Sequence, residues 1–220
     1  MPTFRGADGL WSNFRVEELA TPEAFARDPR LVWEWYEWRR HLVAACRPNR
    51  AHHVLAAWSR LYPRFTLITQ NVDGLHERSG FPPERLVNIH GSDSEVECMA
   101  CHGRAERAAA QELWEGGTAV PRCACGGPWK PATISFGQAL VEADLARSLR
   151  TAATADLFVA AGTSLVVGPV NQMFAIAARA GARTAILTAS ETPYDADADV
   201  KLGEPVEQVL PALRDRVVGR

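Results

Sequence analysis

Four of the five cysteines in the chain occur in two closely spaced pairs. The pairs are Cys98 with Cys101 and Cys123 with Cys125, whereas Cys46 stands alone. In a reducing compartment, cysteine pairs at this spacing favour metal binding over disulfide formation. Four thiolates complete the tetrahedral shell of zinc and leave no open position for a substrate, so we predict one structural Zn²⁺ per chain. Cys46 lies in an apolar helical pattern, which indicates a core position.

Polar side chains follow three short apolar runs, where they are placed to meet a ligand. They are Gln70, Asn71 and Asp73 after the run 65–69, His90 after 86–89, and Gly162, Thr163 and Ser164 after 155–161. An imidazole titrates near neutral pH and can act as a general base. A polar turn between a strand and a helix can hold a phosphate or ribose oxygen. Taken singly, Asn71 and Asp73 are better explained by an ordinary capped turn, and a lone histidine such as His90 is more often structural than catalytic.

Tyr36 and Arg39 form a candidate binding pair for a carboxylate. They are three positions apart in a helical pattern and therefore share one helix face. A guanidinium binds a carboxylate through two hydrogen bonds, and a tyrosine hydroxyl adds a further donor. In an unfamiliar helix, a surface arginine beside a core tyrosine explains the same pattern.

Alternating strands and helices must position these residues. Residues 15–60 are predicted to be helical, with apolar side chains at 32, 35, 38, 42 and 45 and an interruption at Pro48 and Asn49. Strands are predicted at 65–69, 86–89, 155–161 and 184–188, and a helix from Pro169 to about Gly181. The segment 92–135 differs, because its cysteines lie among glycines, prolines and charges. We predict an α/β, Rossmann-like doubly wound parallel sheet from 1–91 and 136–220, a helical insertion at about 15–60, and a zinc-binding module at 92–135.

The composition excludes several functional classes. The chain has 220 residues, of which 47% are hydrophobic, and a formal net charge of -2. This is enough for one good-sized core with a small satellite module. The charge gives no reason to expect nucleic-acid binding, and no apolar run is long enough to cross a bilayer. The N-terminus has no hydrophobic core of a signal peptide. We therefore expect a cytoplasmic protein, and a monomer is favoured.

The order of the motifs resembles the sirtuin family. The resemblance rests on 69–76 (TQNVDGLH), 88–92 (NIHGS), the four cysteines, Phe136-Gly137 and 162–165 (GTSL), and it runs from Thr3 to the C-terminus. It implies an NAD-dependent protein-lysine deacylase that releases nicotinamide and O-acyl-ADP-ribose. His90 matches the family's catalytic base, which accepts a proton from a ribose hydroxyl. The protein partners implied are acylated lysine side chains.

The resemblance also implies the residues that bind NAD and substrate. The positions that match the NAD site are Phe4, Arg5, Gln70, Asn71, Asp73, Gly162, Thr163, Ser164, Thr188, Ala189, Ser190 and Val206. The positions that match the substrate site are Ala20, Tyr36, Arg39, Phe136 and Gly137. The Tyr-x-x-Arg spacing and the small Ala20 resemble the branch that removes succinyl, malonyl or glutaryl groups. Phe136-Gly137 is expected to form an extended edge for the substrate peptide.

The chain departs from the family pattern at its start. The family has a strand and a Gly-Ala-Gly-x-Ser turn before the Phe-Arg-Gly segment, whereas this chain opens at Thr3-Phe4-Arg5-Gly6. We expect an incomplete N-terminus from a start codon assigned too far downstream, with exposed apolar sheet surface and weaker NAD binding as consequences. Thr188 stands where asparagine is usual, and Lys130 replaces an arginine. Two alternatives follow: a non-catalytic zinc-ribbon protein that binds partners, and an ADP-ribosyltransferase that uses the same cleft.

Overall fold

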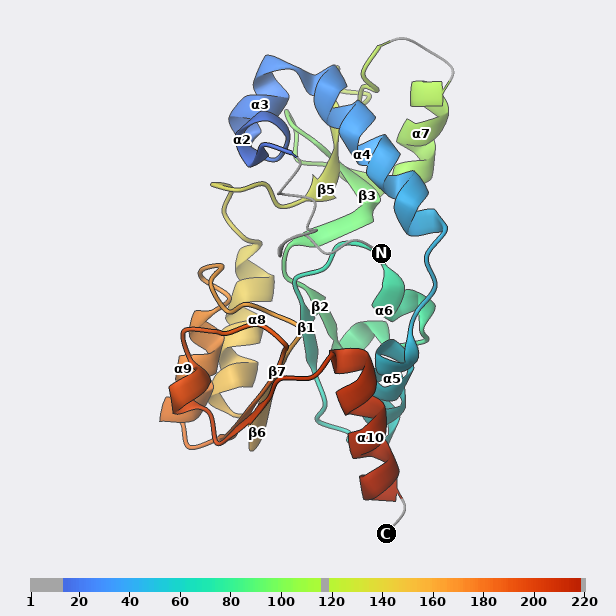
Figure 1. The fold of residues 1–220 in the computed structure, drawn as a ribbon. Helices are drawn as coiled ribbons and strands as arrows, with labels where there is room; N and C mark the ends of the chain where they lie inside the picture. The colour runs from blue at the N-terminus through green and yellow to red at the C-terminus, as the bar shows by residue number, and fades with distance from the viewer. Residues whose placement is uncertain (1–13, 116–118, 219–220) are drawn as a thin grey trace. The chain divides into compact units, whose positions relative to one another are not determined.

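The computed structural model describes residues 14–115 and 119–218 (Figure 1). The helices are α2 (Val16–Leu19), α3 (Pro22–Arg27), α4 (Pro29–Ala44), α5 (Arg50–Leu61), α6 (Leu75–Arg78), the 3-10 helix η1 (Pro83–Arg85), α7 (Arg107–Glu115), α8 (Glu142–Ala153), α9 (Gln172–Arg179), the 3-10 helix η2 (Asp195–Asp197) and α10 (Val206–Val218). The strands are β1 (Leu67–Thr69), β2 (Leu86–Asn88), β3 (Gly91–Cys98), β4 (Arg104–Glu106), β5 (Trp129–Thr133), β6 (Leu157–Ala161), β7 (Arg183–Leu187) and β8 (Val200–Leu202).

The chain forms two compact units, each built from several segments. Unit 1 comprises Met1–Arg47, Thr69–Gly74 and Asn88–Leu140, and unit 2 comprises Pro48–Ile68, Leu75–Val87 and Val141–Arg220. Helices α2 to α4 therefore belong to the same unit as the cysteine pairs, whereas α5 belongs to the other unit. This division differs from the boundaries predicted from the sequence, because the expected helical insertion is split between the two units.

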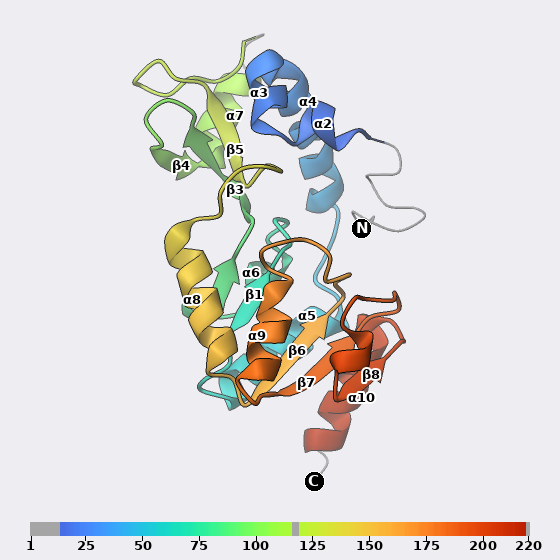
Figure 2. The same ribbon diagram turned by 90° about the vertical axis from the view of Figure 1, so that its left-hand side faces the viewer.

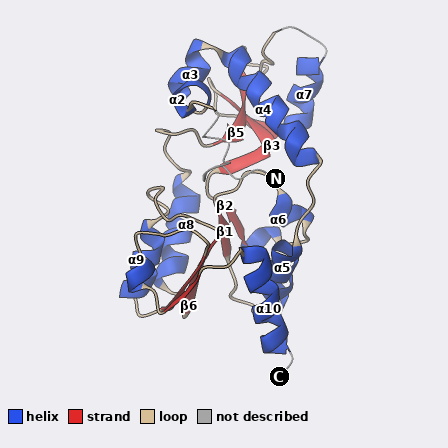
Figure 3. Cartoon of the chain, in the orientation of Figure 1, coloured by secondary structure: helices blue, strands red, loops and turns tan. Residues whose placement is uncertain are grey.

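Unit 1 joins the cysteine-bearing segment and the first helices around one core. Its antiparallel sheet has the strand order β4-β3-β5, and the helices and strands can be followed in Figure 3. Trp33 of α4 is fully buried, stacks on Trp114 of α7 with ring centroids 5.6 Å apart, and donates its indole N–H to the Trp129 carbonyl of β5 at 2.6 Å. Val96 of β3 and Ala110 of α7 complete this contact. One aromatic side chain thus ties α4 to both the sheet and α7.

Helix α4 carries the predicted carboxylate-binding pair and begins with a capping residue and a proline. Asp28 caps its N-terminus by accepting the Leu31 N–H at 3.0 Å, and Pro29 occupies its first turn. The expected apolar stripe is wrong at two positions: Trp38 is 42% exposed, and Ala45 is exposed beyond the end of the helix, while Arg39 is 2% exposed. The buried face runs through positions 32, 36, 39 and 43, as 3.6 residues per turn allow. A charged side chain therefore takes a core position on this helix.

Unit 2 contains a parallel sheet with helices on both faces. Strands β6, β7 and β8 lie side by side in that order, all parallel (Figure 2). Adjacent residues of β7 point to opposite faces, as in any strand. Ile186 packs in a cluster with Phe174 of α9, and the next residue, Leu187, packs in a cluster with Val54 of α5 and Leu210 of α10. This arrangement confirms the predicted Rossmann-like α/β class.

The described strands form three separate sheets rather than one continuous sheet. Besides the two three-stranded sheets, β1 and β2 form a two-stranded sheet. Strand β6 is at one end of its sheet and leaves Leu157 61% and Val159 40% exposed.

Helix α9 begins at Gln172 rather than at Pro169, because Pro169 lies in a preceding turn in which its carbonyl accepts the Gln172 N–H at 3.1 Å. None of the helices in 14–115 and 119–218 is both long and apolar enough to cross a membrane.

Candidate functional site

His90 lies between β2 and β3 in unit 1, with its ring oriented by a backbone carbonyl. Its Nδ1 is 3.2 Å from the Gln70 carbonyl oxygen. A carbonyl can only accept a hydrogen bond, so Nδ1 carries the proton and Nε2 keeps its lone pair. Burial lowers the pKa of His90 below the ordinary 6.5, although the hydrogen bond to Gln70 raises it in part. The ring is therefore neutral at pH 7 and can accept a proton at Nε2.

The segment Thr69–Gly74 is held beside His90 by the backbone. Ile89 donates its N–H to the Thr69 carbonyl at 3.1 Å, and Asp93 donates its N–H to the Val72 carbonyl at 3.0 Å. These bonds flank His90 on both sides. Gln70, Asn71 and Asp73 thus lie in the same unit as the histidine, with Asn71 exposed and Asp73 half-buried.

Gly91 fixes the backbone direction immediately after His90. Its φ is +77°, and a Cβ at this position would clash with the carbonyl of Ala132 on β5. Only glycine combines this left-handed conformation with so close an approach. The Ile134 N–H donates to the His90 carbonyl at 2.8 Å, which ties the residue to the end of β5. The position of the imidazole therefore depends on the β3–β5 contact.

The predicted acyl-binding residues also lie in unit 1. Tyr36 and Arg39 are both buried on α4, and the Tyr36 hydroxyl is 2.6 Å from the Thr133 hydroxyl of β5. Burial raises the pKa of Tyr36 above 10, with partial offset from the Thr133 hydrogen bond and the Arg39 charge, so the phenol stays protonated. Ala20, buried after α2, accepts the Phe136 N–H at 2.8 Å. This bond joins the predicted acyl-pocket and peptide-binding residues.

Phe136 and Gly137 form a turn, not the extended edge expected from the sequence. The turn is closed by the Gln138 N–H, which donates to the Ser135 carbonyl at 3.0 Å. The Gln138 side-chain oxygen in turn accepts the Ser135 N–H at 3.0 Å. Gln138 thus satisfies the backbone of the turn from both sides. Phe136 is 39% exposed, and its role in substrate binding stays a prediction.

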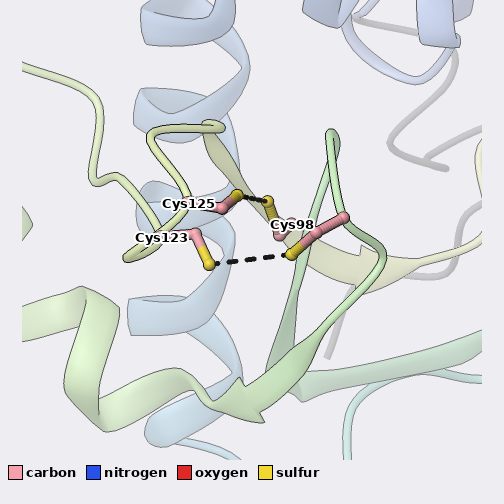
Figure 4. A group of neighbouring side chains, drawn as sticks. Cys98, Cys123 and Cys125 are labelled. Carbon is pink, nitrogen blue, oxygen red and sulfur yellow. Dashed lines mark hydrogen bonds between the residues drawn. The ribbon is translucent and has the colours of Figure 1, made fainter.

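The four paired cysteines converge in unit 1 (Figure 4, where three of them are labelled). Their sulfur atoms all lie within 4.8 Å of one another. The Sγ atoms of Cys98 and Cys125 are 3.4 Å apart, and those of Cys101 and Cys123 are 3.8 Å apart. Tetrahedral zinc with Zn–S bonds of about 2.3 Å requires sulfur separations of roughly 3.8 Å. The donor set and its spacing therefore suit a structural zinc ion.

The surrounding backbone supports thiolate ligands. Hydrogen bonds from the amides of Cys101 and Ala100 lower the pKa of Cys98 to about 6. The Gly127 amide acts the same way on Cys125, but the neighbouring sulfurs outweigh it and raise its pKa to about 12. Close thiolates repel one another, so a divalent cation is needed to hold all four deprotonated. A Cβ at Gly127 would come within 2.7 Å of the Cys98 sulfur, so this position must be glycine.

The remaining predicted NAD residues lie in unit 2, at the ends of parallel strands. Gly162 follows β6 and donates its N–H to the Leu187 carbonyl at 2.9 Å, and Thr188 follows β7 and donates to the Leu202 carbonyl at 3.1 Å. Val206, the first residue of α10, lies close to Gly162. These residues fall at the C-terminal ends of strands, where α/β sheets bind ligands. The other predicted members of this group are Thr163, Ser164, Ala189 and Ser190.

The predicted site thus falls into two groups, one in each unit. The turn Gly162-Thr163-Ser164 lies between β6 and α9, and α9 begins eight residues after Ser164. Phe4 and Arg5 lie outside the described residues.

Three charged residues near the acyl-binding pair were missed by the sequence analysis. Asp93 of β3 forms a buried ion pair with Arg107 of α7, and Arg107 also reaches Glu37 of α4 at 3.3 Å. Asp93 directly follows the NIHGS motif in a mixed polar stretch, and Arg107 precedes an alanine run. Neither position carries a pattern from which burial or pairing can be predicted.

Together, the Rossmann-like α/β fold and the four-cysteine cluster suited to zinc define the class of protein to which the chain belongs. The Sir2 family model matches residues 1–169. The chain is similar to an NAD-dependent protein deacylase of Aquifex aeolicus (strain VF5), with 40% identity over 98% of this chain and 88% of the relative. It is also similar to one of Methylococcus capsulatus (strain ATCC 33009 / NCIMB 11132 / Bath), with 42% identity over 97% of this chain and 85% of the relative.

A solved structure of a Sir2 homologue–NAD complex is 39% identical and covers 99% of this chain and 83% of its own, with a TM-score of 0.89. A second solved structure, a Sir2 homologue mutant in complex with ADP-ribose, has a TM-score of 0.90 at 37% identity, and the match covers 100% of this chain and 88% of that one. The chain belongs to the Sir2 family.

Proposed function

We propose that this chain is an NAD-dependent protein-lysine deacylase that prefers acyl groups ending in a carboxylate. The deacylase activity follows from membership of the Sir2 family and from the names of the relatives, with NAD as co-substrate and zinc as a structural metal. The acidic preference is the finer part of the proposal. The single observation that carries it is the burial of Arg39 beside Tyr36 on α4.

His90 acts as the general base in this proposal. NAD supplies a ribose carbon that is activated when nicotinamide departs. The Nε2 lone pair of His90 accepts the proton of a ribose hydroxyl, while the Gln70 carbonyl holds Nδ1–H and stabilises the charged ring. Asn71 and Asp73 offer an amide and a carboxylate that suit the nicotinamide carboxamide. Gly162, Thr188 and Val206 are assigned to the adenosine end.

In this proposal, Tyr36 and Arg39 bind the carboxylate at the end of the acyl group. A guanidinium binds a carboxylate through two charge-assisted hydrogen bonds, so a carboxylate at the end of the acyl chain suits Arg39. When the Thr133 hydroxyl donates to Tyr36, the Tyr36 O–H is left to donate to the same carboxylate. Ala20 occupies little volume, which leaves space for a chain longer than acetyl. An acetyl group offers Arg39 no charge.

The test compares succinyl-lysine and acetyl-lysine versions of one peptide by nicotinamide release. We expect the succinyl peptide to be turned over with the higher kcat/KM. Arg39→Met should lower kcat/KM for the succinyl peptide by about 100-fold, since a charge-assisted bidentate contact contributes about 3 kcal/mol, and should change acetyl turnover little. Arg30→Met is the matched control, because Arg30 lies on the same helix in an exposed pair with Glu34.

Each part of the proposal has its own contradicting outcome. Preference of the unsubstituted chain for acetyl, or equal loss of both substrates in Arg39→Met, would overturn the acidic preference alone. Absence of nicotinamide release with every acyl peptide, while zinc is bound, would overturn the deacylase activity and favour a zinc-ribbon interaction protein. Transfer of label from NAD to protein would instead favour an ADP-ribosyltransferase.

A further inference from the structure

Lys201 of β8 joins two parts of the loop that follows β7. Its Nζ donates to the Ser190 carbonyl oxygen at 2.8 Å and to a carboxylate oxygen of Asp195 at 2.9 Å. The side chains of Lys201 and Asp195 are 26% and 30% exposed, so the pair is partly shielded from water. Ser190 belongs to the group of residues assigned to NAD. Lys201 therefore ties a predicted NAD-binding segment to the strand beside β7.

The second partner of Lys201, Asp195, is fixed by the loop itself. The Thr192 hydroxyl donates to one carboxylate oxygen at 2.6 Å, and the Thr192 N–H donates to the other at 3.2 Å. The hydrogen bonds from Thr192 and Lys201 lower the pKa of Asp195, so its carboxylate is charged at pH 7. Between them, Tyr194 packs on Phe174 of α9, with ring centroids 5.2 Å apart. The loop thus has a defined conformation around Lys201.

Strand β8 holds both ends of the segment 188–190. It is parallel to β7, with Lys201 opposite Ile186 and Leu202 opposite Leu187 (Figure 2). The Leu202 carbonyl accepts the Thr188 N–H at 3.1 Å, and the Lys201 ammonium binds the Ser190 carbonyl. Consecutive residues of one strand therefore fix the first residue of the segment through the backbone and the last residue through a side chain.

The bond to Lys201 sets the direction of the polar groups in this segment. The peptide between Ser190 and Glu191 is trans, so its N–H points away from the carbonyl that Lys201 holds. Within the described part of the chain, no acceptor takes the N–H of Ala189, Ser190 or Glu191, and all three residues are exposed. Successive free N–H groups of this kind can receive the oxygen atoms of a ligand.

We propose that Lys201 is a positioning residue for NAD: by holding the Ser190 carbonyl, it keeps the N–H groups of the segment directed toward the adenosine end of the co-substrate. The inference rests on the proposed function, which assigns this segment to NAD. Lys201 does not need to touch NAD. Without its ammonium, the Ser190 carbonyl is free to turn, and the binding conformation is populated only part of the time, which weakens the apparent affinity.

Lys201→Met tests the role directly, because it keeps the apolar stem and removes the donors. The KM for NAD should rise by about fivefold to tenfold, whereas kcat and the KM for the acetyl peptide should stay within about twofold. Lys201→Arg, which keeps a charged donor, should stay within about threefold of the unsubstituted chain. Asp195→Asn should raise the KM for NAD less than Lys201→Met does and should add little to it in the double variant, since both act on the same loop.

Inhibition constants separate positioning of the adenosine end from general damage to the fold. ADP-ribose contains the adenosine end, so its inhibition should weaken in parallel with the KM for NAD in Lys201→Met. Nicotinamide contains only the other end, so its inhibition should not change. The melting temperature is measured for each variant. Arg183→Gln is the matched control, because Arg183 lies on β7 in the same sheet and forms an exposed ion pair with Asp199.

The outcomes distinguish this inference from the proposed function. If the unsubstituted chain binds neither NAD nor ADP-ribose, both are overturned. If it turns over NAD but Lys201→Met leaves the KM for NAD unchanged, or raises the KM for NAD and for the peptide equally, the inference alone is overturned. Lys201→Gln has a shorter side chain without the charge, and it decides the question where Lys201→Met does not fold.

Discussion

The imidazole of His90 is oriented by Gln70, whose carbonyl oxygen lies 3.2 Å from Nδ1. Gln70 directly follows β1, and its carbonyl thereby fixes the tautomer of His90, which lies two positions after the end of β2. The bond leaves Nε2 as the proton acceptor, and burial keeps the ring neutral at pH 7. The first prediction follows from these two facts.

The acid limb of the pH–rate profile should lie below pH 6.5. The folded-state pKa of His90 is lowered from the ordinary 6.5 by burial, so the neutral, proton-accepting form persists to lower pH. Activity is expected to be full above pH 6.5 and to be lost as the pH falls through the lowered pKa. The measurement is kcat/KM against pH with the acetyl peptide, because acetyl carries no titrating group. A limb centred above pH 6.5 would show that His90 is not the base or is not desolvated.

Gly91→Ala should destabilise the protein strongly and disturb His90. The added methyl group would meet the backbone carbonyl of Ala132, which cannot move without breaking the β3–β5 pairing. We expect a loss of more than about 2 kcal/mol in the free energy of unfolding, measured with urea. Gly126→Ala is the control: its φ is also positive, at +88°, but nothing lies within 4 Å of the added group. It should cost about 1 kcal/mol, and equal losses in the two variants would contradict the proposed clash.

Cys98→Ser should abolish zinc binding and unfold unit 1. Cys98 is fully buried, next to Met99, which packs against the core cluster, and structural zinc sites supply folding free energy directly. We expect bound zinc, measured by metal analysis, to fall from one per chain to near zero, with a lower melting temperature. Cys46→Ser provides the control and should keep full zinc content, because Cys46 lies outside the four-cysteine cluster. Zinc loss in both variants would argue against the assigned ligands.

The stability of the protein should rise between about pH 8 and pH 10.5 because of Lys130. Burial lowers the pKa of Lys130 from 10.5 to about 8, so in this window the unfolded chain binds more protons than the folded chain. The rise amounts to at most about 3 kcal/mol and is absent below pH 8, where both states are protonated. Urea unfolding of Lys130→Met should show this rise removed. Lys201→Met should retain it, and an unchanged pH dependence in Lys130→Met would refute the assignment.

The acyl-binding helix shows where reading the sequence succeeds and where it does not. The Asp28-Pro29 start and the helical period of the following segment predict α4, because capping and periodicity are local properties. The same period is compatible with either Trp38 or Arg39 on the buried face. Packing of α4 against β5 and α7 places Arg39, and not Trp38, on the buried face. The sequence alone does not distinguish the two arrangements.

The sequence by itself determined the family and the four-cysteine cluster, since each depends on residue types at fixed spacings along the chain. The catalytic role of His90 stays a prediction. Only the tertiary structure decided that Phe136 and Gly137 form a turn, that α2 to α4 share a unit with the cysteine pairs, and that Asp93 is buried against Arg107. Those two residues are 14 positions apart in sequence. Their pairing depends on how α7 packs on β3 and α4, and long-range packing of this kind leaves no periodic signal in a single sequence.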